Sequence, residues 1–158
     1  MAVEPIPEGY HTLSASLIVD PAAEAIDFYK RAFGATERGV MRGPDGKIAH
    51  AELQVGDSVL MLSDPFPMQT AKSPKELGGT SVSLFMYVED VDAAFKQAIE
   101  AGATSTMEPD DMFWGDRFGA LMDPFGHAWA IATHVEDLSE QEMRERGDKA
   151  MAEMASQT

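Results

Sequence analysis

Apolar residues follow two different spacings along the chain, which predicts a mixture of helices and strands. The helical spacing of three or four positions is clearest for Ala22, Ala25, Ile26, Tyr29, Ala32 and Phe33. Asp20-Pro21 precedes this stripe and Gly34 follows it. An acidic cap, an early proline and a final glycine are typical helix boundaries. The pattern predicts a helix that begins at Pro21, is capped by the Asp20 side chain and ends at Gly34.

Short runs of strand-forming residues surround this helix. One run precedes it at 11–19, and three follow it at 36–41, 47–55 and 58–62. The turn-forming sequences Gly43-Pro44-Asp45-Gly46 and Gly56-Asp57 separate the last three runs. The first part of the chain is therefore predicted to be a βαβββ module.

The same order of elements returns after a stretch rich in proline and glycine. Residues 64–79 show no hydrophobic period and are predicted to be a linker. A strand at 80–88, a helix capped by Asp90, and strands at 105–112, 117–122 and 127–133 follow. Gly102-Ala103-Thr104 repeats Gly34-Ala35-Thr36 about 68 positions later. This favours two tandem modules, at 10–63 and 80–134, over a chance likeness of two α+β halves.

A separate tail is predicted after the second module. Ser139-Glu140-Gln141-Glu142 has the spacing of a capping box, so a helix is expected from Glu140 towards Met154, interrupted or bent near Gly147. Its methionines pack on the domain or on a second subunit, or else the helix frays. The expected organisation is one domain at 10–136 and a helical tail at 137–158.

Composition narrows the possible functions. The 158 residues carry a net charge of −15, and such a surface repels nucleic acids and anionic membranes. The chain has no cysteine, which excludes disulfides, thiolate metal sites and cysteine nucleophiles. It has no apolar run of the roughly 20 residues needed to cross a membrane, and its first ten residues are unlike a signal peptide. A cytoplasmic location is expected.

Three stretches of the sequence resemble the vicinal oxygen chelate superfamily, which includes glyoxalases, bleomycin-resistance proteins and dioxygenases. They are Ala25-Ile26-Asp27-Phe28-Tyr29 with Phe33-Gly34, His50-Ala51-Glu52-Leu53 through Gly56-Asp57-Ser58, and Asp123-Pro124-Phe125-Gly126-His127. With Gly115-Asp116-Arg117 they are similar to its PhnB-like, glyoxalase-like branch. The resemblance implies an α+β fold in which two βαβββ modules form an incomplete eight-stranded barrel around a cavity. It also implies a homodimer, and it leaves the reaction open because the superfamily performs several.

The resemblance also implies where a metal would bind. Its four ligand positions fall on Ser14, Leu60, Ser83 and Ala130. Two hydroxyls and two apolar groups are poor ligands for iron, nickel, zinc or manganese. No cofactor is therefore expected. The alternative is a metal-dependent lyase, isomerase or dioxygenase that uses Glu52 with other ligands such as His50.

Strand alternation assigns the remaining candidate residues to faces. The small side chains of Ser14, Ser16, Ser83 and Ala130, together with Phe85, are predicted to line a small-molecule pocket; the alternative is an empty, water-filled groove. His50 and Glu52 share one face of their strand. Glu52 is the candidate catalytic group, with burial expected to raise its pKa. The alternative for His50 is a surface position.

Trp114 and Arg117 complete the predicted pocket. An arginine beside aromatic rings suits an anionic or planar ligand, and the alternative for Arg117 is an ion pair with Asp116 or Asp123. The expected function is small-molecule binding by a homodimer, with no nucleic-acid or membrane partner. A third hypothesis is a partner-binding module that acts through the methionine-rich tail.

Overall fold

Two βαβββ modules follow one another in the computed structural model, which describes residues 3–157. Residues 1, 2 and 158, which belong to the N-terminal segment and the tail discussed above, lie outside the described part. The first module contains β1 (Ala15–Ile18), α1 (Ala22–Phe33), β2 (Thr36–Arg42), β3 (Ile48–Val55) and β4 (Ser58–Ser63). The second contains β5 (Ser83–Tyr87), α3 (Val91–Ala101), β6 (Thr104–Asp111), β7 (Asp116–Met122) and β8 (Ala128–His134).

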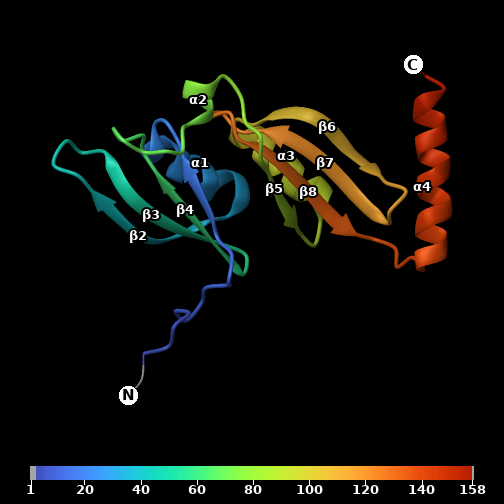
Figure 1. The fold of residues 1–158 in the computed structure, drawn as a ribbon, viewed down its shortest axis with the longest axis horizontal. Coiled ribbons are helices and arrows are strands. Elements are labelled where there is room, and N and C mark those ends of the chain that lie inside the picture. Colours follow the sequence, from blue (N-terminus) through green and yellow to red (C-terminus); the bar gives the residue numbers. More distant parts are fainter. Residues whose placement is uncertain (1–2, 158) are drawn as a thin grey trace.

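The two modules have the same sheet topology. The strand orders are β1-β4-β3-β2 and β5-β8-β7-β6, so the first strand of each module pairs in parallel with its last strand. The other pairs are antiparallel. This correspondence confirms the α+β fold with two tandem βαβββ modules (Figure 1).

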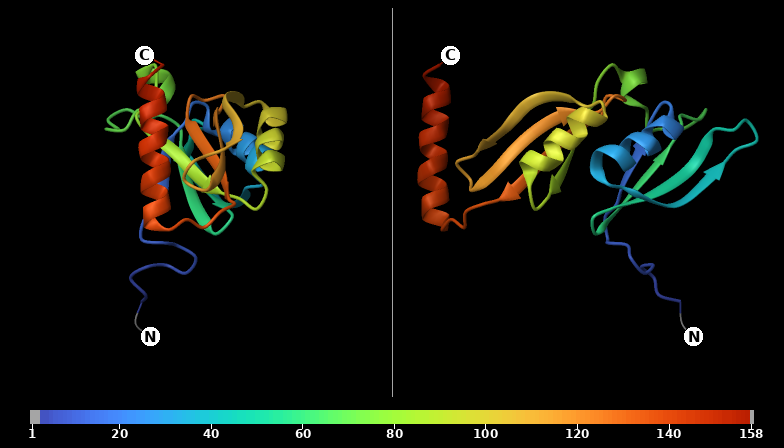
Figure 2. Two further views of the ribbon diagram at one scale, coloured as in Figure 1. Left: turned by 90° about the vertical axis from the view of Figure 1, so that its right-hand side faces the viewer. Right: turned by 180° about the vertical axis from the view of Figure 1, so that it is seen from behind.

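Two further helices lie outside the modules. The short helix α2 (Pro74–Leu77), capped by Ser73, lies in the stretch predicted to have no regular structure. The helix α4 (Glu140–Ala155) begins after Ser139 with the predicted capping box. It continues without a break through Gly147, which corrects the predicted bend there, and it stands at one end of the molecule (Figures 1 and 2). Within residues 3–157, no helix is long and apolar enough to cross a membrane.

The start of α1 differs from the prediction. Pro21 occupies the N-cap position, and no side chain there caps the helix. Asp64 supplies the missing acceptor, because its Oδ1 accepts a hydrogen bond from the backbone N–H of Ala22 at 2.9 Å. Asp20 instead pairs with Lys75 Nζ at 3.3 Å. Gly34 ends the helix at φ 64°, as predicted, because glycine enters the left-handed region without steric cost.

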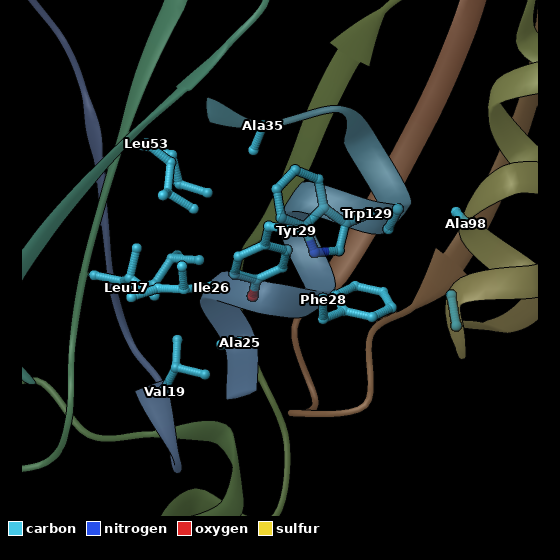
Figure 3. Close-up of a cluster of buried hydrophobic side chains, with 14 of the residues drawn as sticks. Leu17, Val19, Ala25, Ile26, Phe28, Tyr29, Ala35, Leu53, Ala98 and Trp129 are labelled. Carbon is cyan, nitrogen blue, oxygen red and sulfur yellow. The ribbon is translucent and has the colours of Figure 1, made fainter. Parts of the chain in front are cut away.

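One hydrophobic core joins the modules through their helices. Phe28 and Tyr29 of α1 pack near Phe125 and Trp129 of the second module (Figure 3). Hydrogen bonds between α1 and α3 add to this junction: Arg31 Nη1 donates to the Ala101 carbonyl at 3.0 Å, and Gln97 Nε2 donates to the Arg31 carbonyl at 2.8 Å.

The two sheets do not close around a common cavity within one chain. They form separate hydrogen-bonded sheets, and the helices α1 and α3 pack together between them (Figures 1 and 2). The physical reason is that large apolar side chains of both sheets, such as Leu53 and Trp129, lie on the sides that face the helices. The opposite side of each sheet is left uncovered, and the predicted barrel cavity is absent from the single described chain.

Candidate functional site

The uncovered side of the first sheet is polar. On this side lie Ser16, Arg38, His50, Glu52, Gln54 and Met61, with the apolar Met41 and Val59 beside His50 and Gln54, and we call the first six residues the polar face. The alternation that creates it is visible on β3, where Ala51 and Leu53 are fully buried towards α1. His50 and Glu52 therefore point together to the uncovered side, as their spacing predicts.

Glu52 lies at the centre of the polar face. Tyr10 Oη donates a short hydrogen bond to its Oε2, and His50 Nε2 lies 3.0 Å from its Oε1. The side chain is 20% exposed. The hydrogen bonds from His50 and then from Tyr10 lower the pKa of Glu52. The expected upward shift by burial is therefore wrong: this carboxyl group is partly solvated, and its neighbours stabilise the ionised form.

Two residues of this cluster were not predicted from the sequence. The Arg38 guanidinium lies 4.6 Å from the centre of the Tyr10 ring and 3.9 Å, at Nε, from Glu52 Oε2. Tyr10 lies in the segment before β1, where the sequence has no periodic pattern that would assign its side chain to a face of the sheet. Arg38 lies beside a register shift between Glu37 and Gly39 in β2, which breaks the alternation that assigns side chains to faces.

The uncovered side of the second sheet is aromatic. A row of five rings crosses it: Tyr87, Phe85, Phe118, Trp114 and Phe113, which we call the aromatic face. Successive ring centres lie 5.1, 5.8, 5.7 and 5.1 Å apart. Phe85 is 50% exposed and Tyr87 is 64% exposed. Ala130 and Ala132 pair with Phe85 and Tyr87 along β8, so small side chains lie beside the large rings.

A buried carboxylate holds the aromatic face in place. Asp116 accepts hydrogen bonds from Tyr87 Oη at 2.9 Å, Trp114 Nε1 at 3.0 Å and His134 Nδ1 at 2.8 Å. Burial acts to raise the pKa of Asp116, but these hydrogen bonds outweigh it and lower the pKa. Asp137 binds the other ring nitrogen of His134 at 3.0 Å. The two carboxylates, Asp116 first, raise the pKa of His134.

His134 is expected to stabilise the fold only while it is protonated. Its pKa is raised by folding, so this contribution is complete below the unfolded value of about 6.5 and disappears as the pH rises through the folded value. Urea denaturation of wild type and His134→Asn tests this. The difference between their midpoints should be larger near pH 5.5 than near pH 9. His11→Asn, at another exposed histidine, is the matched control, and an equal difference at both pH values would contradict the prediction.

The structure brings together only part of the predicted pocket. Ser16, His50 and Glu52 lie on the polar face, with Ser14 just before β1. Ser83, Phe85 and Ala130 lie on the uncovered side of the second sheet, with Trp114 beside them. Within one chain these two groups belong to separate faces.

Arg117 lies on the other side of the second sheet. Its Nε contacts Asp92 Oδ2 of α3 at 2.7 Å, and its Nη1 contacts Asp111 Oδ1 at 3.2 Å. These carboxylates, Asp92 first, raise the pKa of Arg117. The guanidinium is thus paired with neither Asp116 nor Asp123, and it is directed away from the aromatic face.

The donor set of the family's metal site does not fit a divalent metal here. Leu60 lies in the hydrophobic core and is 5% exposed. Ala130 is also buried and pairs with Phe85 on the neighbouring strand, and neither side chain has an atom that could bind a metal. Ser14 and Ser83 offer only hydroxyls, which are weaker ligands than imidazole and carboxylate. Within residues 3–157, no three His, Asp or Glu side chains gather as a possible metal site.

A groove lies elsewhere, at the junction between the modules. It has a volume of about 760 Å³, and Phe28, Phe125, Glu24, Asp27 and Lys75 are among its lining residues. None of the residues predicted to form the pocket lines it.

The comparison with protein families identifies the class of protein to which this fold belongs. Residues 11–131 match the model of the Glyoxalase/Bleomycin resistance protein/Dioxygenase superfamily. The chain therefore belongs to this superfamily, as its motifs predict.

Particular relatives extend the comparison. An uncharacterised protein of Mycobacterium tuberculosis is 44% identical over 135 residues, which cover 84% of this chain and 79% of the relative. An uncharacterised protein of Arabidopsis thaliana is 31% identical over 119 residues, 69% of each chain.

Solved structures show the same fold. TioX from Micromonospora sp. ML1 is 27% identical, with a TM-score of 0.63 over 79% of this chain and 99% of that one. The Arabidopsis thaliana protein, whose crystal structure is also known, gives a TM-score of 0.64 over 78% of this chain and 98% of that one. These relatives are similar in fold and are not assigned a reaction by their names.

Proposed function

We propose that this protein binds a small organic molecule with a flat, conjugated part, and that it does so without the metal used by enzymes of its superfamily. The row of rings on the aromatic face, of which Phe85 and Tyr87 are exposed and the other three are half-buried, carries this proposal. Exposed aromatic side chains offer large stacking surfaces, and Asp116 fixes the orientation of two of them through Tyr87 and Trp114. A preformed platform of this kind binds flat molecules without a large ordering cost.

A second copy of the chain would complete the site. The polar face and the aromatic face lie on separate sheets, and α1 and α3 pack between those sheets. Pairing the polar face of one chain with the aromatic face of another would enclose a cavity of mixed character, which suits a small-molecule site. A two-fold arrangement forms two such cavities, because each chain contributes one face to each. We therefore propose a homodimer with two equivalent sites.

Replacing Phe85 by alanine is expected to weaken binding of a flat ligand by about 5- to 150-fold, because stacking on one aromatic side chain contributes about 1–3 kcal/mol. The probes are 2-naphthol, 2-naphthylmethylamine and 2-naphthoate, measured by calorimetric titration of the full chain. The net charge of −15 favours the amine over the carboxylate. Leu77→Ala is the matched control, since Leu77 is 65% exposed on α2, away from both faces.

Three results would oppose this proposal. Equal affinity of wild type and Phe85→Ala would remove the aromatic face from the site. A sedimentation mass equal to the 17.1 kDa of one chain, with binding retained, would show that a second copy is not needed. About one metal ion per chain after growth in metal-supplemented medium would favour the alternative, a metal-dependent lyase, isomerase or dioxygenase that uses Glu52.

A further inference from the structure

The pair formed by His50 and Glu52 has the arrangement of a general base and its orienting carboxylate. We propose that His50 removes a proton from carbon through its Nδ1, with Glu52 as the positioning residue and no metal involved. This adds a reaction to the binding function proposed above. It depends on the polar face and does not depend on stacking against the aromatic face.

The direction of the hydrogen bond follows from the charge of Glu52. An ionised carboxylate only accepts hydrogen bonds, and the pKa of Glu52 is lowered by His50 and Tyr10. His50 Nε2, at 3.0 Å from Glu52 Oε1, must therefore be the donor. In the neutral imidazole the other nitrogen, Nδ1, is then unprotonated and is the basic atom.

His50 differs from the three other histidines because one of its ring nitrogens is hydrogen-bonded to a carboxylate while the other has no partner among residues 3–157. His134 has a carboxylate on each nitrogen, so neither of its ring nitrogens is free to act as a base. His127 is buried, and its Nε2 contacts the Ile18 carbonyl at 3.1 Å. His11 Nε2 contacts the Asp57 carbonyl at 3.1 Å. His50 is 47% exposed, and its Nδ1 has no hydrogen-bond partner among residues 3–157.

The surroundings of Glu52 keep the carboxylate in place. Tyr10 Oη binds its Oε2, which leaves Oε1 for His50. The Arg38 guanidinium covers the Tyr10 ring and also donates to Gln54 Oε1 at 3.0 Å. These contacts come from the N-terminal segment, β2 and β3, so three separate segments fix the orientation of one imidazole. A base with a fixed orientation loses little entropy when the reaction occurs.

The reaction class is proton removal from a carbon acid, a small molecule whose C–H bond lies next to an electron-withdrawing group. The C–H bond breaks, its proton forms a bond to Nδ1, and the electron pair moves onto the electron-withdrawing group. The imidazolium that results is stabilised by the ionised carboxylate of Glu52. The proton then returns to the product or passes to water, and no oxidant or reductant is needed.

The probe 5-nitrobenzisoxazole tests this step directly. A base removes the hydrogen on its carbon, the electron pair forms a nitrile, the N–O bond breaks, and a coloured phenolate is released. We expect the wild-type full chain to open this ring faster than free imidazole at the same concentration. His50→Gln should lower kcat/KM about 100-fold, which is within the usual contribution of a general base. His11→Gln, at an exposed histidine outside the polar face, should remain within about twofold of wild type.

Glu52→Gln separates positioning from folding. It should lower kcat while leaving KM unchanged, and the low-field NMR signal expected for the His50 Nε2 proton should move upfield, because an amide oxygen is a weaker acceptor. Thermal unfolding of each variant shows whether it is folded. Wild-type turnover by His50→Gln, or a wild-type rate no greater than that of imidazole, would overturn the proposal. Loss of turnover in His50→Gln with unchanged affinity in Phe85→Ala would support the base while contradicting the proposed aromatic binding site.

Discussion

Replacing Asp123 by alanine is expected to lower the free energy of unfolding by about 3–5 kcal/mol, the range for a buried charged network that loses one partner. Asp123 is 3% exposed and accepts four hydrogen bonds. Tyr29 Oη donates at 2.7 Å and Trp129 Nε1 at 3.0 Å. The backbone N–H groups of Phe125 and His127 each donate at 2.9 Å. Alanine leaves these donors without their acceptor in the interior.

The loss is large because Asp123 connects the two modules. Tyr29 belongs to α1 of the first module, whereas Trp129 belongs to β8 of the second. Burial, and then the carboxylate, raise the pKa of Tyr29 well above its usual value, so the hydroxyl keeps its proton and acts as a donor. Asp123 therefore stabilises its own turn and also holds the two modules together. The contact between the modules in turn keeps the polar face and the aromatic face on separate sides of the molecule.

Urea denaturation followed by tryptophan fluorescence measures this effect. The control is Asp45→Ala, in the turn between β2 and β3 of the first module, where Asp45 is exposed and, among the described residues, accepts only from the N–H of Lys47 at 3.2 Å. That change should cost less than about 1 kcal/mol. If Asp123→Ala lowers the free energy of unfolding no more than Asp45→Ala does, the Asp123 carboxylate does not hold the two modules together.

Local periodicity was sufficient to predict the helix and strands of each module and the buried side of strands such as β3 and β8, but it did not predict α2. Leu53 and Trp129 lie in the core, as the alternation of their strands predicts. Such patterns depend only on residues that are close together in the sequence, so they can be recognised without the structure. The tandem arrangement was predictable for the same reason, since both modules carry the same glycine after their first helix.

The relative placement of the two sheets was not predictable in this way. A strand pattern shows that one side is apolar, but it does not show which element covers that side or whether the other side meets the same chain or another. Here α1 and α3 pack against each other, so residues such as Glu52 and Phe85 lie on separate faces. Arg117 lies on the helix-facing side of its sheet, whereas the other predicted residues lie on or beside the two uncovered faces, and their gathering into one cavity depends on the proposed second copy.

Contacts between distant segments account for the remaining differences. Tyr10 reaches Glu52 across 42 positions, and after the hydrogen bond from His50, which has the larger effect, this contact lowers the pKa of Glu52 instead of allowing burial to raise it. Arg117 alternates with Asp116 and Phe118 along β7, so it lies on the opposite side of the sheet from these residues, where it pairs with Asp92 of α3. No short-range signal in the sequence identifies either partner.

Asp64 is the strongest example of such a contact, and Asp64→Ala is expected to lower the free energy of unfolding by about 2–4 kcal/mol. It lies in the stretch predicted to be a featureless linker, and it is 7% exposed. Its Oδ1 accepts from the N–H of Ala22 at 2.9 Å and its Oδ2 from the N–H of Ile48 at 2.7 Å. Alanine leaves the first N–H of α1 and the first N–H of β3 buried without an acceptor.

Asp20→Ala is the decisive control, because the local sequence predicts Asp20 as the cap of α1. In the structure Asp20 contacts only the exposed Lys75, and an exposed ion pair contributes less than about 1 kcal/mol. Urea midpoints and helix content by circular dichroism should therefore fall strongly in Asp64→Ala and little in Asp20→Ala. The reverse order would show that the adjacent residue caps the helix. The expected order would show that α1 is capped by a side chain 42 positions away in the sequence. It would also show that this distant cap supports the contact between the modules, because α1 forms that contact.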